Sequence, residues 1–538
     1  MESNRHRASA FVDAFINGVK WEDEVARMHR REQITKQQIV DFANRLFADN
    51  YVTVYKQQGV DSTQKKIDKP AITPIPTNRD FVSDFVREVQ NTQVEPIHPR
   101  FVDFQKDLTV TKTKKQLPLL YKKNDENGLF TLAFRYDFGT ETDKRYEVAA
   151  NYLEYLGTKK FDAVQQKQKF YQLACNYSVN VGDDHITITL SGLDDNMVPA
   201  LQRLEDQLRN AQPDPEAYEQ MVELLLKTRS DNKQDQEECY LALSSYGIYG
   251  EYNSTRNVMS EQQLRQTKPQ ELISLLKQLS NYEHTVLYYG PQSQEALEAM
   301  LTKYHQVPAK RMAATEGKPY LKQPTTQNEV WIAPYDAKNI YMRMYHNDET
   351  QWTPDRAAVQ ALFNEYFGAG MNGIVFQELR EARGLAYDAY AYYSRPTEKG
   401  RSECFFTHIV TQNDKMMDCV REFHHILDSL PQSQGAFNIA KESLTKQLST
   451  LRTTKFAVFN AYLRAKKLGI DYDLNQRIFN DLPSLQLKDI VEFEKQQMAG
   501  RACRYLILGN EEELDIEALR KLTGAQLRRV TLEEAFGY

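Results

Sequence analysis

Apolar and polar positions repeat with two different periods along the chain, and the changes of period divide it into four segments. Residues 1–58 show helical periodicity and then one alternating strand at 51–55. Residues 59–105 carry scattered prolines among polar residues and predict an extended inter-domain linker. Residues 106–315 and 316–538 each mix strand and helix patterns, so each predicts one α/β unit.

The two long units resemble each other, which predicts one fold repeated. Tyr152-Leu-Glu-Tyr155-Leu-Gly157 in the first unit is matched by Phe363-Asn-Glu-Tyr366-Phe-Gly368 in the second. A helix, a strand and a glycine follow one another three times, ending at Gly59, Gly290 and Gly509. Three such tails but only two complete units are present, so we interpret residues 1–58 as the end of a third, truncated repeat.

Composition excludes several classes of protein. The 538 residues are 41% hydrophobic and 26% charged, which is typical of a soluble globular protein. A net charge of −6 gives no basic surface for nucleic acid. No apolar run approaches the roughly 18 residues that span a membrane, and no signal peptide is visible. The five cysteines form no C-x-x-C pair, so we expect buried free thiols.

The strongest local signal runs from residue 367 to 393. It opens on glycines, continues as a helix-like run, breaks at Gly384 and ends as an alternating strand. Its glycines spell G-x-G-x-x-G but follow a helix and not a strand, which argues against a dinucleotide site. We expect them instead to allow a tight turn between two helices.

The same stretch carries a family resemblance. Phe376-Gln-Glu-Leu-Arg380-Glu-Ala-Arg-Gly384-Leu-Ala-Tyr387 is similar to the late F-x-E-L-R-x-x-x-G-L-A-Y segment of the pitrilysin/insulinase (inverzincin) family of zinc metallopeptidases. The resemblance implies an α+β fold of two tandem homologous units. Each would be a mostly antiparallel sheet with helices packed on one face, preceded by the helical tail of a truncated unit. Family enzymes use four such units that close around a peptide-holding chamber.

The family's zinc motif, H-x-x-E-H, is absent. At the matching place of the first unit stand Asn151, Glu154 and Tyr155, and residues 362–366 of the second unit also lack histidine. Asparagine and tyrosine cannot supply the paired imidazoles that zinc needs at this spacing. We therefore expect no metal and no cofactor on this chain, and the resemblance implies that zinc is held by a missing N-terminal half.

The resemblance also implies a substrate-side pair, Arg380 and Tyr387, that holds the peptide and stabilises the scissile carbonyl. A guanidinium and a phenol can both donate hydrogen bonds to a carbonyl oxygen that gains negative charge. The residue types by themselves leave another interpretation open: a surface arginine paired with Glu381 or Glu378, and a core tyrosine. The first unit has Cys175 in place of Tyr387 and so lacks the pair.

These observations predict the C-terminal, non-zinc half of a pitrilysin/insulinase-type metallopeptidase. It would close the chamber, bind peptide and complete a site in trans, and be inactive by itself. The expected partners are a zinc-bearing N-terminal half, on the same polypeptide or a separate subunit, and a peptide substrate. The alternative is a stand-alone, non-catalytic peptide-binding or assembly protein with the same fold. A periplasmic and a cytoplasmic location both stay open, because a signal would lie on the missing half.

Overall fold

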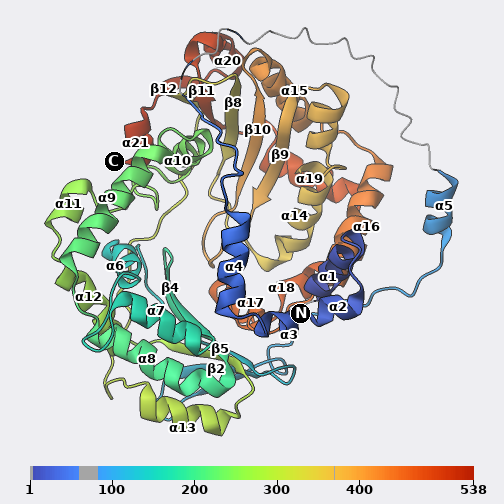
Figure 1. Ribbon diagram of the computed structural model, residues 1–538. Coiled ribbons are helices and arrows are strands. Elements are labelled where there is room, and N and C mark those ends of the chain that lie inside the picture. Colours follow the sequence, from blue (N-terminus) through green and yellow to red (C-terminus); the bar gives the residue numbers. More distant parts are fainter. Residues whose placement is uncertain (1–3, 58, 60–62, 64–82, 369) are drawn as a thin grey trace. The chain divides into compact units, whose positions relative to one another are not determined.

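The computed structural model describes residues 4–57, 59, 63, 83–368 and 370–538, which fall into two compact units, Met1–Gln93 and Val94–Tyr538 (Figure 1). The first unit is helical. Its helices are α1 (Asn4–Ile16), α2 (Trp21–Val25), α3 (Arg27–Glu32), α4 (Lys36–Leu46) and α5 (Asp84–Asn91). Helix α4 begins at a capping box in which Thr35 and Gln38 bond each other's backbone N–H groups.

The strand expected at residues 51–55 does not form. The chain there has no regular secondary structure, and its tyrosines and valines are exposed. A strand needs a neighbour, and no other strand occurs among the described residues of this unit. Much of the predicted linker lies outside the described residues, while its last part belongs to the second unit, where the Val102 N–H donates to Asp473 at 3.1 Å.

The second unit contains two six-stranded sheets, of which the first has the order β1-β2-β6-β3-β5-β4. Its strands are β1 (Thr109–Lys112), β2 (Pro118–Lys123), β3 (Leu129–Tyr136), β4 (Cys175–Val181), β5 (Ile186–Leu193) and β6 (Thr285–Gly290). Only β2 and β6 pair in parallel. The helices of this repeat are α6 (Arg145–Leu153), α7 (Ala163–Gln172), α8 (Met197–Asn210), α9 (Pro215–Asn232), α10 (Gln236–Tyr249), α11 (Glu261–Gln266), α12 (Pro269–Gln278) and α13 (Gln294–Tyr304).

The second sheet has the order β12-β7-β11-β8-β10-β9. Its strands are β7 (Glu329–Pro334), β8 (Asn339–His346), β9 (Ala386–Ser394), β10 (Cys404–Gln412), β11 (Arg504–Gly509) and β12 (Gln526–Arg529). Its helices are α14 (Ala357–Phe363), α15 (Met416–Asp428), α16 (Gln434–Thr450), α17 (Ala457–Leu468), α18 (Leu474–Asp481), α19 (Leu487–Gln497), α20 (Ile516–Thr523) and α21 (Leu532–Phe536). The predicted α+β class with mostly antiparallel sheets is confirmed.

The topology repeats strand for strand. Strands β2, β6, β3, β5 and β4 occupy the same successive places in their sheet as β7, β11, β8, β10 and β9 in theirs. Only the outermost strand differs. Strand β1 precedes its repeat and pairs antiparallel, whereas β12 follows its repeat and pairs in parallel.

Each repeat lends one helix to the other repeat's sheet. Helix α10 of the first repeat packs on the second sheet, where Tyr246 joins a buried cluster with Trp331. Helix α17 of the second repeat packs on the first sheet, where Phe459 joins a buried cluster with Leu287. Helix α10 follows α9 in the first repeat, and α17 follows α16 at the equivalent place in the second. The exchange is therefore reciprocal, and it joins the two repeats into one compact unit.

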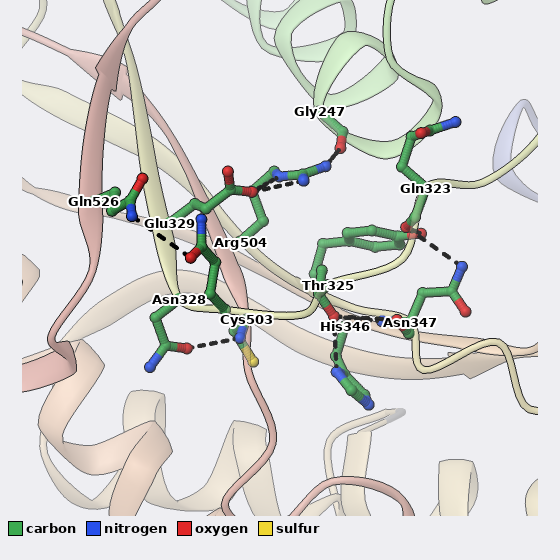
Figure 2. Close-up of polar contacts among 12 residues, drawn as sticks. Gly247, Gln323, Thr325, Asn328, Glu329, His346, Asn347, Cys503, Arg504 and Gln526 are labelled. Carbon is green, nitrogen blue, oxygen red and sulfur yellow. Dashed lines mark hydrogen bonds and ion pairs between the residues drawn. The ribbon is translucent and has the colours of Figure 1, made fainter.

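Figure 2 shows how Arg504, at the start of β11, fastens α10 to the second sheet. Its guanidinium pairs with Glu329 at 2.6 Å and donates to the carbonyl of Gly247. The same figure shows a contact between the segment that precedes β7 and the end of β8. There the hydroxyl of Thr325 lies 3.0 Å from the Nδ1 of His346. A buried arginine needs such partners, since an unpaired charge in the interior is costly.

Candidate functional site

The segment that joins the predicted site residues is a π-helical turn, η5 (Phe376–Ala382), followed by a sharp break and β9. Gly384 has φ +57°, in the left-handed region that glycine enters without strain. Its N–H donates to the carbonyl of Arg380 at 3.0 Å. The break therefore ends the helical turn and sends the chain directly into the strand.

Tyr387 sits on a β-bulge. In the pairing of β9 with β10, Val410 opposes Asp388 and Thr411 opposes Ala386, so Tyr387 is left without a partner. A bulge re-aims one side chain out of the regular alternation. As a result Tyr387 is 78% exposed, although Ala386 and Ala389 beside it are buried. The interpretation of Tyr387 as a core residue is wrong.

The structure brings Arg380 and Tyr387 together. The guanidinium carbon of Arg380 lies 5.6 Å from the centroid of the Tyr387 ring and 4.9 Å from that of Phe376. Glu381 reaches Arg380 only at 4.0 Å, and both side chains are about half exposed, so this pair holds the arginine weakly. Glu378, the other predicted partner, pairs instead with Arg383.

Three further residues hold this segment in place: Thr411 and Lys415, for which no local sequence signal exists, and Gly368 of the G-x-G-x-x-G string. The Thr411 hydroxyl donates to the carbonyl of Leu385 at 2.5 Å, and Lys415 Nζ donates to the carbonyl of Gly384 at 3.0 Å. Gly368 has no room for a side chain, because a Cβ there would lie 1.8 Å from the carbonyl oxygen of Ala391. Close packing of the preceding helix on β9 thus explains one glycine of the G-x-G-x-x-G string.

The same edge strand carries polar and aromatic side chains next to Tyr387. Tyr390 stacks on His408 with ring centroids 4.8 Å apart, and Tyr240 of α10 lies 3.0 Å from the His408 Nδ1. Burial lowers the pKa of His408, while Asp388 at 3.6 Å opposes that shift. Asp388, Tyr390 and the neighbouring Tyr392 are exposed, so β9 presents a carboxylate and two phenols on the residues that follow Tyr387.

The three positions that match the family's zinc motif, Asn151, Glu154 and Tyr155, lie on and after helix α6 of the first repeat. Asn151 lies in the last turn of helix α6, and Glu154 and Tyr155 directly follow the end of that helix at Leu153. The side chains of Asn151, Glu154 and Tyr155 are exposed. Within the described part of the chain, no three His, Cys, Asp or Glu side chains gather as a metal site would require. In the second repeat the matching Glu365 accepts hydrogen bonds from Ser443 and Gln447. These residues do not fit a zinc ion.

Two other sequence expectations can be compared with the structure. All five cysteines are buried and free, which confirms that prediction. Among the described helices, none combines the length and the hydrophobicity that a membrane-spanning helix needs.

Comparison with known proteins places this fold. Residues 268–444 match the family model described as the peptidase M16 inactive domain. A search of the curated proteins finds no match. Among solved structures, the chain resembles the peptidase M16 inactive domain from Pseudomonas fluorescens, with a TM-score of 0.60 and 15% identity, covering 75% of this chain and 98% of that one.

Two longer proteases also resemble the chain. The periplasmic protease PqqL from Escherichia coli gives a TM-score of 0.61 at 13% identity, covering 95% of this chain and 58% of that one. A mutant of the ferredoxin protease FusC in complex with Arabidopsis ferredoxin gives 0.60 at 10% identity, with 94% and 58% covered. The chain therefore spans somewhat more than half the length of these two proteases. The family-model match over residues 268–444 bears out the predicted resemblance to the pitrilysin/insulinase (M16) peptidases, and these solved structures share the fold of the chain.

Proposed function

We propose that this chain is the half of an M16-type zinc metallopeptidase that holds peptide, and that Arg380 and Tyr387 complete a catalytic site whose zinc is bound by a partner half. The observation that carries the proposal is the exposed stack of Arg380 on Tyr387 at the bulged end of β9. Two hydrogen-bond donors of different geometry thereby meet at one point of the surface.

Their chemistry suits acyl transfer. When a peptide carbonyl is attacked, its oxygen gains negative charge, and donors already aimed at that oxygen stabilise the transition state. The phenol of Tyr387 and the guanidinium of Arg380 can both donate there. Both are mounted on a turn that Thr411 and Lys415 hold by its carbonyl oxygens, so little reorganisation is needed when the peptide arrives.

Strand β9 also supplies a means of binding extended peptide. It is the outer strand of its sheet, so one side of its backbone pairs with no other strand among the residues that the structure describes. An extended peptide can pair with such an edge through main-chain hydrogen bonds. Exposed Tyr390 and Tyr392 would then contact the peptide's side chains.

Zinc binding and water activation belong in this proposal to the partner half, because Asn151, Glu154 and Tyr155 do not fit the metal. The proteases PqqL and FusC, of which the chain covers 58%, support a relationship to a longer assembly. This chain alone is then expected to lack peptidase activity.

The test is hydrolysis of a quenched fluorescent peptide. The chain is assayed alone and after mixing with an H-x-x-E-H-bearing half from the same genome. The matched control is that half with its motif glutamate replaced by glutamine. Turnover only in the unaltered mixture supports the proposal. Chelator-sensitive turnover by the chain alone would overturn it.

The same assay addresses the alternative function. If the mixture shows no turnover but a labelled peptide binds the chain, and Tyr390→Ala weakens that binding, the stand-alone peptide-binding protein is the better description. If neither turnover nor peptide binding occurs, both functions fail.

A further inference from the structure

One carboxylate next to the proposed site has no cationic partner of its own. Both glutamates of η5 have an arginine partner, Arg383 for Glu378 and, at 4.0 Å, Arg380 for Glu381. The side chain of Asp388, near the start of β9, is 53% exposed. No lysine or arginine among the described residues lies within ion-pairing distance of Asp388. A cation from outside the chain can therefore reach this carboxylate without displacing another.

A histidine beside Asp388 does not neutralise it. The Nε2 of His408 lies 3.6 Å from Asp388 Oδ2, which is too long for a hydrogen bond. His408 is buried, and this burial lowers the pKa of its imidazole below the ordinary value of 6.5. The ring is therefore neutral at pH 7.5, and it brings no positive charge to Asp388.

A tyrosine of the first repeat fixes which ring nitrogen carries the proton. The Tyr240 hydroxyl lies 3.0 Å from the Nδ1 of His408. Because a carboxylate only accepts hydrogen bonds, the ring proton belongs on Nε2, which faces Asp388, and the hydroxyl donates to Nδ1. The carbonyl of Met342 lies 3.4 Å from the same hydroxyl. If Nδ1 gains a proton, the hydroxyl can donate to that carbonyl and accept from the ring, so both charge states of His408 have a partner.

Groups from three elements face the His408 ring. They are Asp388 and Tyr390 of β9, Tyr341 and Arg343 of β8, and Tyr240 of α10. The Asp388 carboxylate favours a second proton on the ring, whereas the Arg343 guanidinium opposes it. When acid protonates His408, the imidazolium stands next to Asp388 as its counter-ion. The negative charge that an outside cation would meet is then reduced.

We infer that Asp388 is a specificity-determining residue, which pairs with a lysine or arginine side chain of the bound peptide, and that protonation of His408 cancels this pairing. The inference deepens the proposed function and rests on it for the peptide and for its place on β9. His408 and Tyr240 act through Asp388 and are positioning residues. The peptides favoured at neutral pH are those with a basic residue close to the bond that is cleaved.

The alternation of β9 puts this carboxylate where a peptide side chain would lie. Asp388 and Tyr390 are exposed on one face of the strand, and Ala389 between them is buried on the other. A peptide paired with the outer edge of β9 places every second side chain on the exposed face, with Cβ atoms of opposed residues about 5 Å apart. A long cationic side chain there can reach the carboxylate and contact the Tyr390 ring. Because Asp388 directly follows Tyr387, this cation lies close to the scissile carbonyl.

The first experiment measures peptide binding to the full chain by fluorescence anisotropy at pH 7.5 and low ionic strength. The probes are two labelled peptides of alternating threonine and valine that differ only in a central residue, arginine or its neutral isostere citrulline. The repetitive flanks let either peptide shift its register until the central side chain lies beside Asp388. The wild-type chain should bind the arginine peptide about three- to fivefold more tightly, as expected of an exposed ion pair.

Substitution of the carboxylate should remove this preference. Asp388→Asn should bind both peptides equally and bind the citrulline peptide as the wild type does. The matched control is Asp471→Asn, which changes another exposed aspartate of the second repeat, between α17 and α18, and should keep the preference. Equal binding of the two peptides by the wild type would overturn the inference. A preference that survives in Asp388→Asn would overturn it as well.

The pH dependence tests the role of His408. The arginine preference of the wild type should fall toward one as the pH is lowered from 7.5 to 5. His408→Gln, which cannot gain a proton, should keep the preference at both pH values, with thermal melting as the check that this buried substitution is tolerated. A preference that is constant in the wild type, or that falls equally in His408→Gln, would contradict the switch.

A second measurement of the switch needs no substitution of a buried residue. The protonation midpoint of the His408 ring is followed by NMR in the wild type and in Asp388→Asn. Loss of the carboxylate removes the group that favours the imidazolium, so the midpoint should move to lower pH. An unmoved midpoint would show that the two side chains are not coupled.

Failure of the inference and failure of the proposed function give different results. Turnover by the reconstituted peptidase that is equal for the arginine and citrulline peptides would overturn the inference alone. An arginine preference in binding that depends on Asp388, without turnover in the mixture, would overturn the catalytic role of Arg380 and Tyr387 alone. If neither peptide binds the chain, the peptide-holding role and the inference fail together.

Discussion

Gly247 of α10 and Leu506 of β11 touch so closely that a Cβ on Gly247 would lie 2.4 Å from the Leu506 Cδ2. This contact joins a helix of the first repeat to the sheet of the second. At the same place the guanidinium of Arg504 donates a hydrogen bond to the Gly247 carbonyl, so helix α10 and strand β11 are joined by both packing and a hydrogen bond. The reciprocal exchange of α10 and α17 therefore depends on the absence of a side chain at this position.

Gly247→Ala should destabilise the chain. Overpacking of a tight interior contact typically costs about 1–3 kcal/mol, and helix propensity recovers less than that for alanine. The free energy of unfolding, measured in urea, should fall by about 1–2 kcal/mol. Gly128→Ala is the control, since a Cβ there meets nothing within 4 Å. Equal stability of the two variants would contradict the close contact.

Arg380→Ala and Tyr387→Phe should each lower the kcat of the reconstituted peptidase. Loss of one preorganised donor to a developing oxyanion commonly costs about 10²–10³-fold in kcat. Neither side chain is buried, so circular dichroism and thermal melting should stay unchanged. Tyr171→Phe removes a phenol that is 86% exposed on helix α7, outside the proposed site, and serves as the control. An effect of less than twofold for both site variants would argue against their role.

Thr411→Val should impair the site more than the fold. The substitution keeps the shape of the side chain but removes the hydrogen bond to the Leu385 carbonyl, at a cost of about 1–2 kcal/mol in stability. Because that bond fixes the turn that carries Arg380 and Tyr387, kcat should fall by about tenfold while peptide binding changes little. Thr411→Ser, which keeps the hydroxyl, should restore turnover. Equal turnover of the valine and serine variants would exclude a positioning role.

Glu494 should make stability depend on pH. Burial, with a smaller contribution from Asp428, raises the pKa of this α19 carboxyl to about 7. The unfolded chain ionises the same carboxyl near 4.5, so its contribution is intact below that pH and is lost as pH rises from about 4.5 to about 7. Glu494→Gln should therefore raise the free energy of unfolding by about 1–3 kcal/mol at pH 8 and by little at pH 4.

The control for this prediction is Glu492→Gln, two residues earlier on the exposed side of α19. It should leave the pH profile of urea unfolding unchanged. A Glu494→Gln profile parallel to that of the wild type would show that the carboxyl ionises equally in both states.

Part of the site could be predicted because its signal is local. The segment from Phe376 to Tyr387 predicts a helical turn, a break at Gly384 and the start of a strand, and the structure has all three. Arg380 and Tyr387 also lie close together because they are near each other in the sequence, on either side of the break at Gly384. Thr411 and Lys415 could not be found in this way, because strand pairing and helix packing bring them to the turn from a later part of the chain.

The sequence by itself determined the repeated order of helices and strands. It also determined the arginine and tyrosine of the motif and the lack of imidazoles at Asn151 and Tyr155. Each of these depends only on residue type and spacing. Tertiary structure decided the rest. The bulge that exposes Tyr387 arises from its register with β10, and the buried carboxyl of Glu494 from the packing of α19. Residues 51–55 have the pattern of a strand and form none, because a strand's hydrogen bonds require a neighbour that local sequence cannot supply.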